Sequence, residues 1–299
     1  IKTLFEEKND KWVEPEHTAV FLPNNNSEFL WLSERDGFMN LYKYNINNKN
    51  EKELTQFNWV IKEIIGFDNS GKNVIVLGTG SDARETKAYK VNVKNGTFET
   101  LTEEAGSHTV QLSSDGKYIM DSYTSIDVPR IVKRKSIDDG KEVIIYTSKN
   151  PIKDYQLGTT EFVTLTSKEG SDLFGRIIKP ANFDETKEYP VLVYVYGGPH
   201  AQMVTNSWLG GSNLWMQWMA AEQDYIVFTI DNRGSENRGF AFESVIHRQA
   251  GEAEMEDQLT GVDYLKSLDY VDGNRLSVFG WSYGGFMANS LMLRHPGVF

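Results

Sequence analysis

The amino-acid sequence predicts two architectures in succession: the later part of a β-propeller over residues 1–152, and an α/β domain with a mostly parallel sheet over residues 153–299. Three observations predict this. The first half repeats with a period near 45 residues, the hydrophobic periodicity changes after Pro151, and the heptapeptide GWSYGGF occupies residues 280–286. With 299 residues the chain is long enough for about two domains, each with its own core.

The first half contains three segments with one common pattern. Each has a polar turn, an apolar strand, a charged turn, a second strand with alternating apolar residues, a polar hairpin turn and a third short strand. Corresponding turn residues, 44 and 45 positions apart, are Ser27, Gly71 and Gly116. The closing threonines, 47 and 45 positions apart, are Thr55, Thr102 and Thr147. A period of about 40 to 50 residues is typical of a four-stranded propeller blade.

The first residues, KTLFEEKNDKWVEP, match the end of such a repeat, so we expect them to contain the last strand of a fourth blade. Propellers close with about four to eight blades because closure protects the strand edges. We therefore expect further blades upstream of this sequence. The alternative for the three repeats is an open antiparallel sheet of three meanders.

The second half predicts strands that alternate with helices. Two strands, EFVTLTS and DLFGRIIKP, precede the apolar run PVLVYVYGG, a helix over residues 214–223 and the strand YIVFTIDNRG. A helix near residues 256–268, the strand RLSVFGWS and a helix over residues 283–294 follow. Nearly continuous apolar strands that alternate with helices predict a parallel sheet covered on both faces.

Two side-chain patterns in this half have structural interpretations. The apolar residues Trp215, Trp218 and Met219 recur at helical spacing and predict a core face. An acidic run suits the positive end of a helix dipole and predicts a solvated helix start rather than a metal or cation site; its members are Glu252, Glu254, Glu256 and Asp257.

The heptapeptide GWSYGGF follows a predicted strand and opens a predicted helix. A tight turn from strand to helix needs small residues on both sides of the central serine, and Gly280 and Gly284 supply them. The serine is then exposed near the positive end of a helix, where a developing oxyanion is favoured. Ser282 is therefore the candidate nucleophile of an α/β-hydrolase domain.

An oxyanion hole needs donors directed at the tetrahedral oxygen. The residue after the nucleophile, Tyr283, usually provides one through its backbone amide. The loop after the third strand of this half reads VYVYGGPHAQ, and Tyr196 precedes Gly197 and Gly198 where many esterases have His-Gly-Gly. The hydroxyl of Tyr196 is the candidate second donor; the alternative is a packed aromatic at the strand end.

Composition excludes several other functions. The net charge of −11, without a local basic stripe, argues against nucleic acid as a partner. The sequence has no cysteine, and its five histidines lack metal-ligand spacing, so we expect neither a metal nor a cofactor. Apolar runs fall short of the roughly 20 residues that a transmembrane helix needs, and the first residues do not resemble a signal peptide.

The motifs VYVYGGP, DNRGS and GWSYGGF together resemble the prolyl oligopeptidase family of serine peptidases, in which a propeller caps an α/β-hydrolase domain. Within that family, YVYGGPHAQ, RGSENRGFAFE and VIHRQAGEAEMEDQLTGVDYLKS are most similar to the dipeptidyl peptidase IV and prolyl tripeptidyl peptidase branch. The resemblance implies a serine exopeptidase that releases di- or tripeptides from short peptides, preferentially after proline. The alternatives are an acylaminoacyl peptidase or carboxylesterase on the same scaffold, or a non-catalytic binding protein.

In this family the catalytic Asp and His follow the nucleophile. His295 is thirteen residues after Ser282 along a helix, or about 20 Å away at 1.5 Å per residue, and His200 precedes the nucleophile. We therefore expect the Asp and His of the triad beyond Phe299, and the 299-residue fragment itself to be inactive. The resemblance also implies an upstream glutamate pair for the substrate amino terminus and a later aromatic proline pocket.

The DNRGS motif leaves two interpretations open. Asp231 and Arg233 either contact substrate or brace the active-site loops, and strand-end charges favour bracing. The resemblance further favours an exported, periplasmic location and allows a homodimer.

Overall fold

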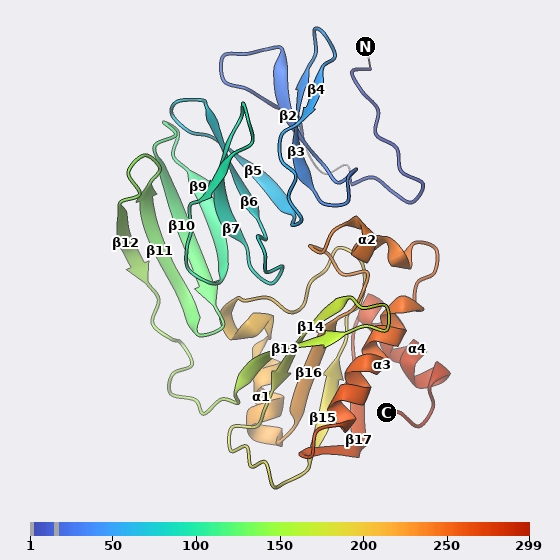
Figure 1. Cartoon of the computed structure of the whole chain (residues 1–299). Coiled ribbons are helices and arrows are strands. Elements are labelled where there is room, and N and C mark those ends of the chain that lie inside the picture. The colour runs from blue at the N-terminus through green and yellow to red at the C-terminus, as the bar shows by residue number, and fades with distance from the viewer. Residues whose placement is uncertain (1–2, 15–17) are drawn as a thin grey trace. The chain divides into compact units, whose positions relative to one another are not determined.

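The computed structural model describes residues 3–14 and 18–299, and Figure 1 shows its strands and helices. The chain divides into two compact units. The first comprises Ile1–Ser148 and the short segment Asn237–Ala241, and the second comprises Lys149–Glu236 and Phe242–Phe299. Each unit has hydrophobic cores of its own. No helix among the described residues is long and apolar enough to cross a membrane.

The first unit consists of three four-stranded antiparallel sheets, one for each sequence repeat, with the strands of each sheet in chain order. The first sheet contains β1 (Val20–Phe21), β2 (Glu28–Ser33), β3 (Asn40–Asn45) and β4 (Glu51–Glu53). The second contains β5 (Ile61–Phe67), β6 (Asn73–Gly78), β7 (Lys87–Asn92) and β8 (Phe98–Thr100). The third contains β9 (Ser107–Leu112), β10 (Tyr118–Ser125), β11 (Val128–Ser136) and β12 (Glu142–Thr147).

The repeated residues have the same structural role in successive sheets. The hydroxyls of Thr55 and Thr102 are buried, and each accepts a 2.9 Å hydrogen bond from a backbone amide fourteen residues earlier, Leu41 and Ala88 respectively. These bonds extend the pairing of β3 and β7 beyond the ends of the short edge strands β4 and β8. The period found in the sequence therefore reflects a repeated backbone contact as well as repeated turns.

The expected fourth-blade strand at the start of the chain is absent from residues 3–14, which form no regular structure. This segment instead packs on the first sheet through side chains. The ring of Phe5 lies 5.4 Å from that of Trp31 and 5.3 Å from that of Tyr44, and the Tyr44 hydroxyl donates to the carbonyl oxygen of Leu4. Apolar residues in this stretch, which suggested a strand, are therefore explained by aromatic packing.

The second unit contains one five-stranded sheet in the order β13-β14-β16-β15-β17. Its strands are β13 (Thr160–Thr166), β14 (Asp172–Ile178), β15 (Tyr189–Tyr194), β16 (Ile226–Asp231) and β17 (Val271–Phe279). Its helices are η1 (Trp208–Gly211), α1 (Leu214–Gln223), α2 (Phe240–Glu243), η2 (Ser244–Ile246), α3 (Ala253–Lys266) and α4 (Tyr283–Arg294), although the first two residues of α2 are grouped with the first unit.

The sheet is mixed, which corrects the expectation of a mostly parallel one. β15 pairs in parallel with β16 and β17, whereas β14 pairs antiparallel with β13 and β16. Parallel neighbours need a long crossover, which α1 and α3 provide, while β13 and β14 are joined by a short turn that permits only antiparallel pairing.

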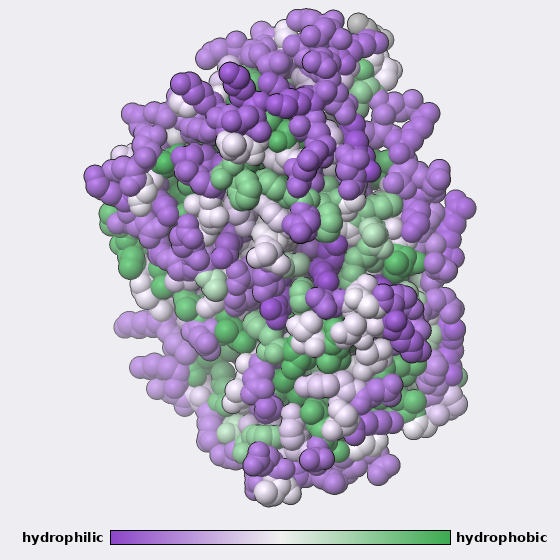
Figure 2. All heavy atoms as spheres, in the orientation of Figure 1, coloured by the Kyte–Doolittle hydropathy of each residue, from purple (hydrophilic) through white to green (hydrophobic). Residues whose placement is uncertain are grey.

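Helices cover both faces of this sheet, as the sequence predicts. α1 packs on one face through Met216 and Ala220, and α3 packs on the other through Val262 and Leu265 (Figure 1). The expected core stripe of α1 is wrong for Trp215 and Trp218, which are 40% and 47% exposed, whereas Met219 is partly buried and packs against the core. The Trp215 ring lies 5.1 Å from that of Phe279 at the end of β17, and the fully buried apolar residues of α1 are Met216 and Ala220. In Figure 2 the visible face of the molecule is mainly hydrophilic, with smaller apolar areas.

Candidate active site

Ser282 lies in the turn between β17 and α4, with backbone angles φ 55° and ψ −124°. A positive φ is unusual for a residue with a side chain, and such conformations cost about 1–3 kcal/mol. The conformation places an exposed serine at the N-terminal end of a twelve-residue helix. This strained strand-to-helix turn is the geometry in which α/β hydrolases present their nucleophile.

The two flanking glycines are required by close backbone packing. A Cβ atom on Gly280 would lie 2.4 Å from the carbonyl oxygens of Gly284 and Val195, and one on Gly284 would lie 2.2 Å from that of Val195. Contacts under 3.0 Å to a backbone oxygen cannot be relieved by a side-chain rotation. The steric reason that the sequence suggested for these glycines is therefore confirmed.

The loop after β15 contacts this turn directly. The Val195 amide donates a 2.9 Å hydrogen bond to the carbonyl oxygen of Phe279, which joins the ends of the two parallel strands. A Cβ atom on Gly284 would also approach the Cα atom of Tyr196 to 3.1 Å. The structure thus brings together Tyr196, Ser282 and Tyr283, the three site residues that the sequence predicts.

The two tyrosines of the site have different hydroxyl environments. Tyr283 donates a 2.6 Å hydrogen bond to Oε1 of Glu254. Burial and this hydrogen bond raise the pKa of Tyr283 well above its ordinary value. Within the described part of the chain, the half-buried Tyr196 makes no hydrogen bond through its hydroxyl, and its ring lies 6.2 Å from that of Tyr283. Of the two tyrosine hydroxyls, that of Tyr196 is therefore the one available to a ligand.

The end of β16 braces the loop that carries Tyr196. Both carboxylate oxygens of Asp231 accept backbone amides of this loop, from Met203 at 2.8 Å and from Val204 at 2.9 Å. The next residue, Asn232, is fully buried and donates from Nδ2 to the carbonyl oxygen of Gly197 at 3.0 Å. The main chain of this loop is therefore held at both ends.

A buried arginine supports the same loop from β14. Arg176 is fully buried, and its Nη1 donates to the carbonyl oxygens of Met203 at 2.9 Å and Gly210 at 2.6 Å. Burial lowers the pKa of Arg176 to about 10. The side chain still donates to several acceptors, so its charge is compensated by carbonyl dipoles along the loop.

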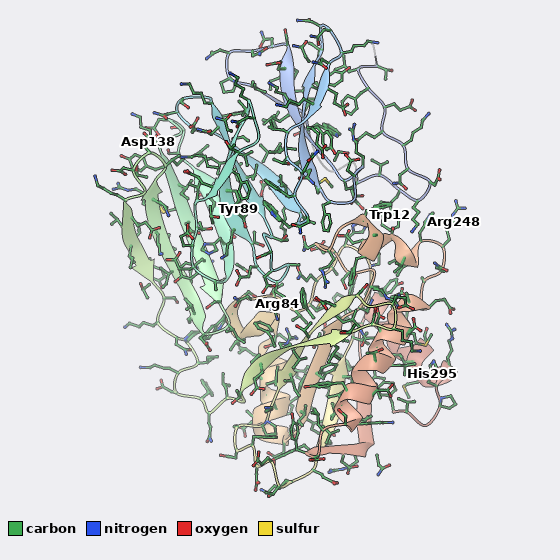
Figure 3. The ribbon with its side chains drawn as sticks, in the orientation of Figure 1. Trp12, Arg84, Tyr89, Asp138, Arg248 and His295 are labelled. Carbon is green, nitrogen blue, oxygen red and sulfur yellow. The ribbon has the colours of Figure 1, made fainter. Side chains whose placement is uncertain are left out.

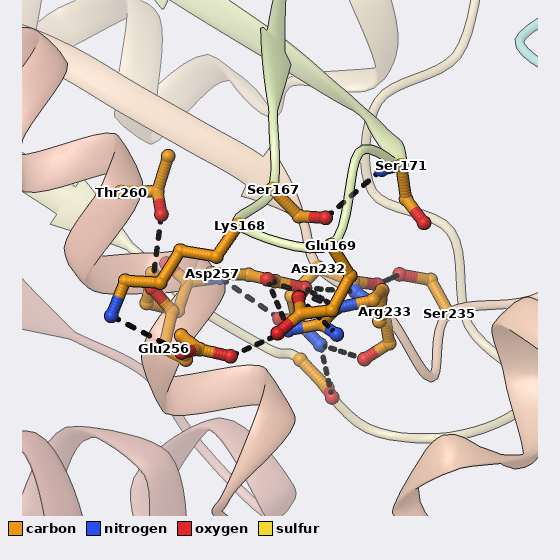
Figure 4. A network of polar contacts seen from close by, with 12 residues as sticks. Ser167, Lys168, Glu169, Ser171, Asn232, Arg233, Ser235, Glu256, Asp257 and Thr260 are labelled. Carbon is orange, nitrogen blue, oxygen red and sulfur yellow. Dashed lines mark hydrogen bonds and ion pairs between the residues drawn. The ribbon is translucent and has the colours of Figure 1, made fainter.

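Arg233 ties the same strand end to α3, in the network shown in Figure 4. Its guanidinium contacts Asp257 at 2.9 Å, Glu256 at 2.9 Å and Glu169, and its backbone amide donates to Asp257 at 2.7 Å. Oxygens of these three acidic residues lie within 4.8 Å of one another, with the arginine charge among them. The bracing interpretation of Asp231 and Arg233 agrees with these contacts.

The expected solvated start of α3 is wrong for two of its four acidic residues. Glu254 and Asp257 are fully buried, whereas Glu252 is exposed. Two neighbours of the site, Asn232 and Glu254, were not predicted from the sequence. A signal was present, because both lie in the segments that resembled a peptidase family, but their partners are far away in the sequence.

The histidines do not complete a triad with Ser282 in the described residues, where no histidine ring makes a hydrogen bond with the serine. His295 follows the C-terminal end of α4 (Figure 3), and its backbone amide donates a hydrogen bond to the carbonyl oxygen of Leu291. His200 is exposed in the loop after β15.

Two regions of the chain match family models of known proteins. Residues 1–130 match the model of the dipeptidyl peptidase IV N-terminal region, and residues 212–299 match that of the prolyl oligopeptidase family. A solved structure from Bacteroides ovatus, assigned provisionally as a dipeptidyl aminopeptidase IV, has a TM-score of 0.92 and 40% identity over 97% of this chain. Dipeptidyl peptidase 4 from Porphyromonas gingivalis has a TM-score of 0.88 and 27% identity over 97% of this chain.

Curated relatives include human and mouse dipeptidyl peptidase 8, which are 29% and 27% identical over 99% of this chain. The two family-model matches and the solved structures at 40% and 27% identity point to one class of protein. The chain belongs to the prolyl oligopeptidase family. It spans 37–38% of the length of these two relatives, and 44% and 41% of the two solved chains.

Proposed function

We propose that the protein containing this chain is a serine exopeptidase that releases dipeptides from the amino terminus of short peptides, preferentially after proline. The observation that carries the proposal is the strained Ser282 at the end of β17, beside a loop with an available phenol. The names of the similar proteins favour dipeptide release over the tripeptide release that the sequence left open.

In the proposed mechanism, Ser282 attacks the carbonyl carbon of the scissile peptide bond and forms an acyl-enzyme, which water then hydrolyses. The Tyr283 amide and the Tyr196 hydroxyl donate to the oxyanion. A histidine accepts the serine proton and an aspartate orients it; we place both residues after Phe299. No metal or cofactor has a role in this scheme.

The fold class is proposed in more detail on the same grounds. The three sheets are three blades of a propeller whose later part spans residues 1–152, and residues 153–299 are the first part of the α/β-hydrolase domain. A propeller cap would restrict substrates to short, unfolded peptides. An exported, periplasmic location and a homodimer are further parts of this proposal, and both are supported by family resemblance.

The test uses the full-length protein with glycyl-prolyl p-nitroanilide, a matched tripeptide substrate, an N-acetylated peptide and a p-nitrophenyl ester. We expect hydrolysis of the free dipeptide substrate, which Ser282→Ala abolishes. Preferential cleavage of the acetylated peptide or of the ester would instead identify an acylaminoacyl peptidase or a carboxylesterase. Residues 1–299 alone should hydrolyse none of the four substrates. Turnover by this chain would show that the catalytic base lies within residues 1–299.

A further inference from the structure

The carboxylate of Glu254 is buried against the hydroxyl of Tyr283, the residue that follows the proposed nucleophile, and it has no positive partner among the described residues. Glu254 lies in the first turn of α3 and is fully buried. Across the described residues, it makes no ion pair. Its Oε2 accepts the Gly251 amide at 3.0 Å, and its Oε1 accepts the Tyr283 hydroxyl at 2.6 Å. Burying a carboxylate is costly unless its oxygens are hydrogen-bonded, so the Tyr283 hydroxyl satisfies a strong requirement.

Tyr283 connects this carboxylate to the reacting groups. It is the residue after Ser282 and the first residue of α4. Its ring packs against the oxyanion loop, because a Cβ atom on Gly198 would lie 2.7 Å from the Tyr283 Cγ atom. The side chain is thus fixed at both ends: Glu254 holds its hydroxyl, and the peptide beside Ser282 holds its backbone.

We infer that Glu254 is a positioning residue, whose buried carboxylate fixes Tyr283 and so orients the Tyr283 amide toward the oxyanion. The inference rests on the proposed function and deepens it. Glu254 touches neither Ser282 nor a substrate carbonyl in this arrangement; it acts through Tyr283. The bond also keeps the Tyr283 phenol away from the oxyanion, which leaves Tyr196 as the phenol donor.

The test compares Glu254→Gln, Tyr283→Phe and the double variant in the full-length protein. Two rates are measured: steady-state hydrolysis of glycyl-prolyl p-nitroanilide, and labelling by a fluorophosphonate, in which the serine oxygen displaces fluoride from phosphorus. The end point of labelling counts folded sites, so every rate is expressed per site. Glu252→Gln is the matched control, because Glu252 is exposed in the adjacent turn and contacts Arg294.

We expect either single variant to lower kcat per site and the labelling rate about 10-fold, with KM changed less than about 2-fold. The double variant should lose no more than the more affected single variant, because both changes remove the same bond. Glu252→Gln should keep the parent rates.

Unchanged rates per site in Glu254→Gln and Tyr283→Phe, even with lower melting temperatures, would overturn the inference and make the contact purely structural. Additive losses in the double variant would also overturn it. If the parent reacts with the fluorophosphonate but does not cleave the dipeptide substrate, the proposed function is wrong, and the labelling rates still decide the role of Glu254.

Discussion

The side-chain amide of Asn232 donates a 3.0 Å hydrogen bond to the carbonyl oxygen of Gly197, 35 residues earlier in the chain. The same amide donates to the carbonyl oxygen of Arg233 at 2.7 Å, and its oxygen accepts from Gln258 at 2.9 Å. All of these atoms are buried, so the contact fixes the loop that carries Tyr196 with no competition from water.

Replacing Asn232 with Ala should remove the donor to the buried carbonyl oxygens of Gly197 and Arg233, leave Gln258 with its 3.1 Å bond to Ile230 alone, and lower the free energy of unfolding by about 3 kcal/mol. We also expect kcat to fall, because the Tyr196 loop loses its support. Urea unfolding and steady-state rates measure the two effects. Asn182→Ala is the control, since Asn182 is exposed and accepts a hydrogen bond only from Gln156 among the described residues. Equal losses in both variants would contradict this assignment.

Tyr196→Phe in the full-length protein should lower kcat about 10²- to 10³-fold and leave KM nearly unchanged. The ring still fills its site and its hydroxyl makes no bond with the described residues, so the melting temperature should stay within about 1 °C of the parent. A variant with full kcat would assign the oxyanion to backbone amides alone. Parallel losses of kcat and melting temperature would make Tyr196 structural.

The conformation of Ser282 predicts a difference between two inactive variants. Ser282→Ala keeps a Cβ atom at φ 55°, whereas Ser282→Gly removes it. Glycine should therefore be more stable than alanine by about 1 kcal/mol in chemical unfolding, after allowance for the greater freedom of glycine in the unfolded chain. Equal stability would show that this backbone conformation carries no strain.

Two adjacent glycines of α4 should respond differently to the same change. A Cβ atom on Gly284 would lie 2.2 Å from a backbone oxygen, whereas one on Gly285 would have its nearest neighbour at 3.6 Å. We expect Gly284→Ala to destabilise the protein by more than about 3 kcal/mol and Gly285→Ala to be neutral or stabilising by about 0.5–1 kcal/mol. Thermal unfolding measures the stability of the two variants. Comparable stability would refute the packing described for the turn.

Asp68 predicts the pH dependence of the first unit. Burial alone would raise the pKa of Asp68, but hydrogen bonds from Asn73 and Ser70 outweigh it and hold the pKa below its ordinary value. A lowered pKa in the folded state contributes stability above the unfolded pKa, and this contribution is lost as pH falls through the folded pKa.

Asp68→Asn should therefore cost about 1–2 kcal/mol at pH 7, and the difference from the parent should shrink below about pH 4. Asp138→Asn, an exposed aspartate in a hairpin turn, is the control for charge alone. Unfolding curves from pH 7 to pH 2 provide the comparison. A constant difference across this range would contradict the role of the Asp68 charge.

Local patterns predicted the parts of the fold that depend on nearby residues. α1 begins and ends where expected because Asn213 caps its first turn and Asp224 ends it in the left-handed conformation. The three repeats were visible because each sheet is built from consecutive strands. The serine turn could be predicted because the two glycines that it requires, Gly280 and Gly284, lie within five residues of one another in the sequence.

Long-range partners could not be predicted in this way. An acidic residue in a first helical turn gives the same pattern whether it is solvated or buried. The partners that decide this are Arg233, 24 residues before Asp257, and Tyr283, 29 residues after Glu254. The first residues misled for a similar reason, because apolar residues that pack as rings on a sheet have the composition of a strand.

Three consecutive residues at the end of β16, Asp231, Asn232 and Arg233, bind three different segments: the amides of residues 203–204, the carbonyl of Gly197 and the start of α3. Asp231 and Asn232 thus hold loop 197–204 through main-chain atoms of the loop rather than through its side chains. A loop grafted here must keep glycine at position 197, because the φ of Gly197 is 73° and a Cβ atom on it would lie 2.8 Å from Oδ1 of Asn232. It must also keep its length, so that one carbonyl returns to Asn232 and two amides return to Asp231.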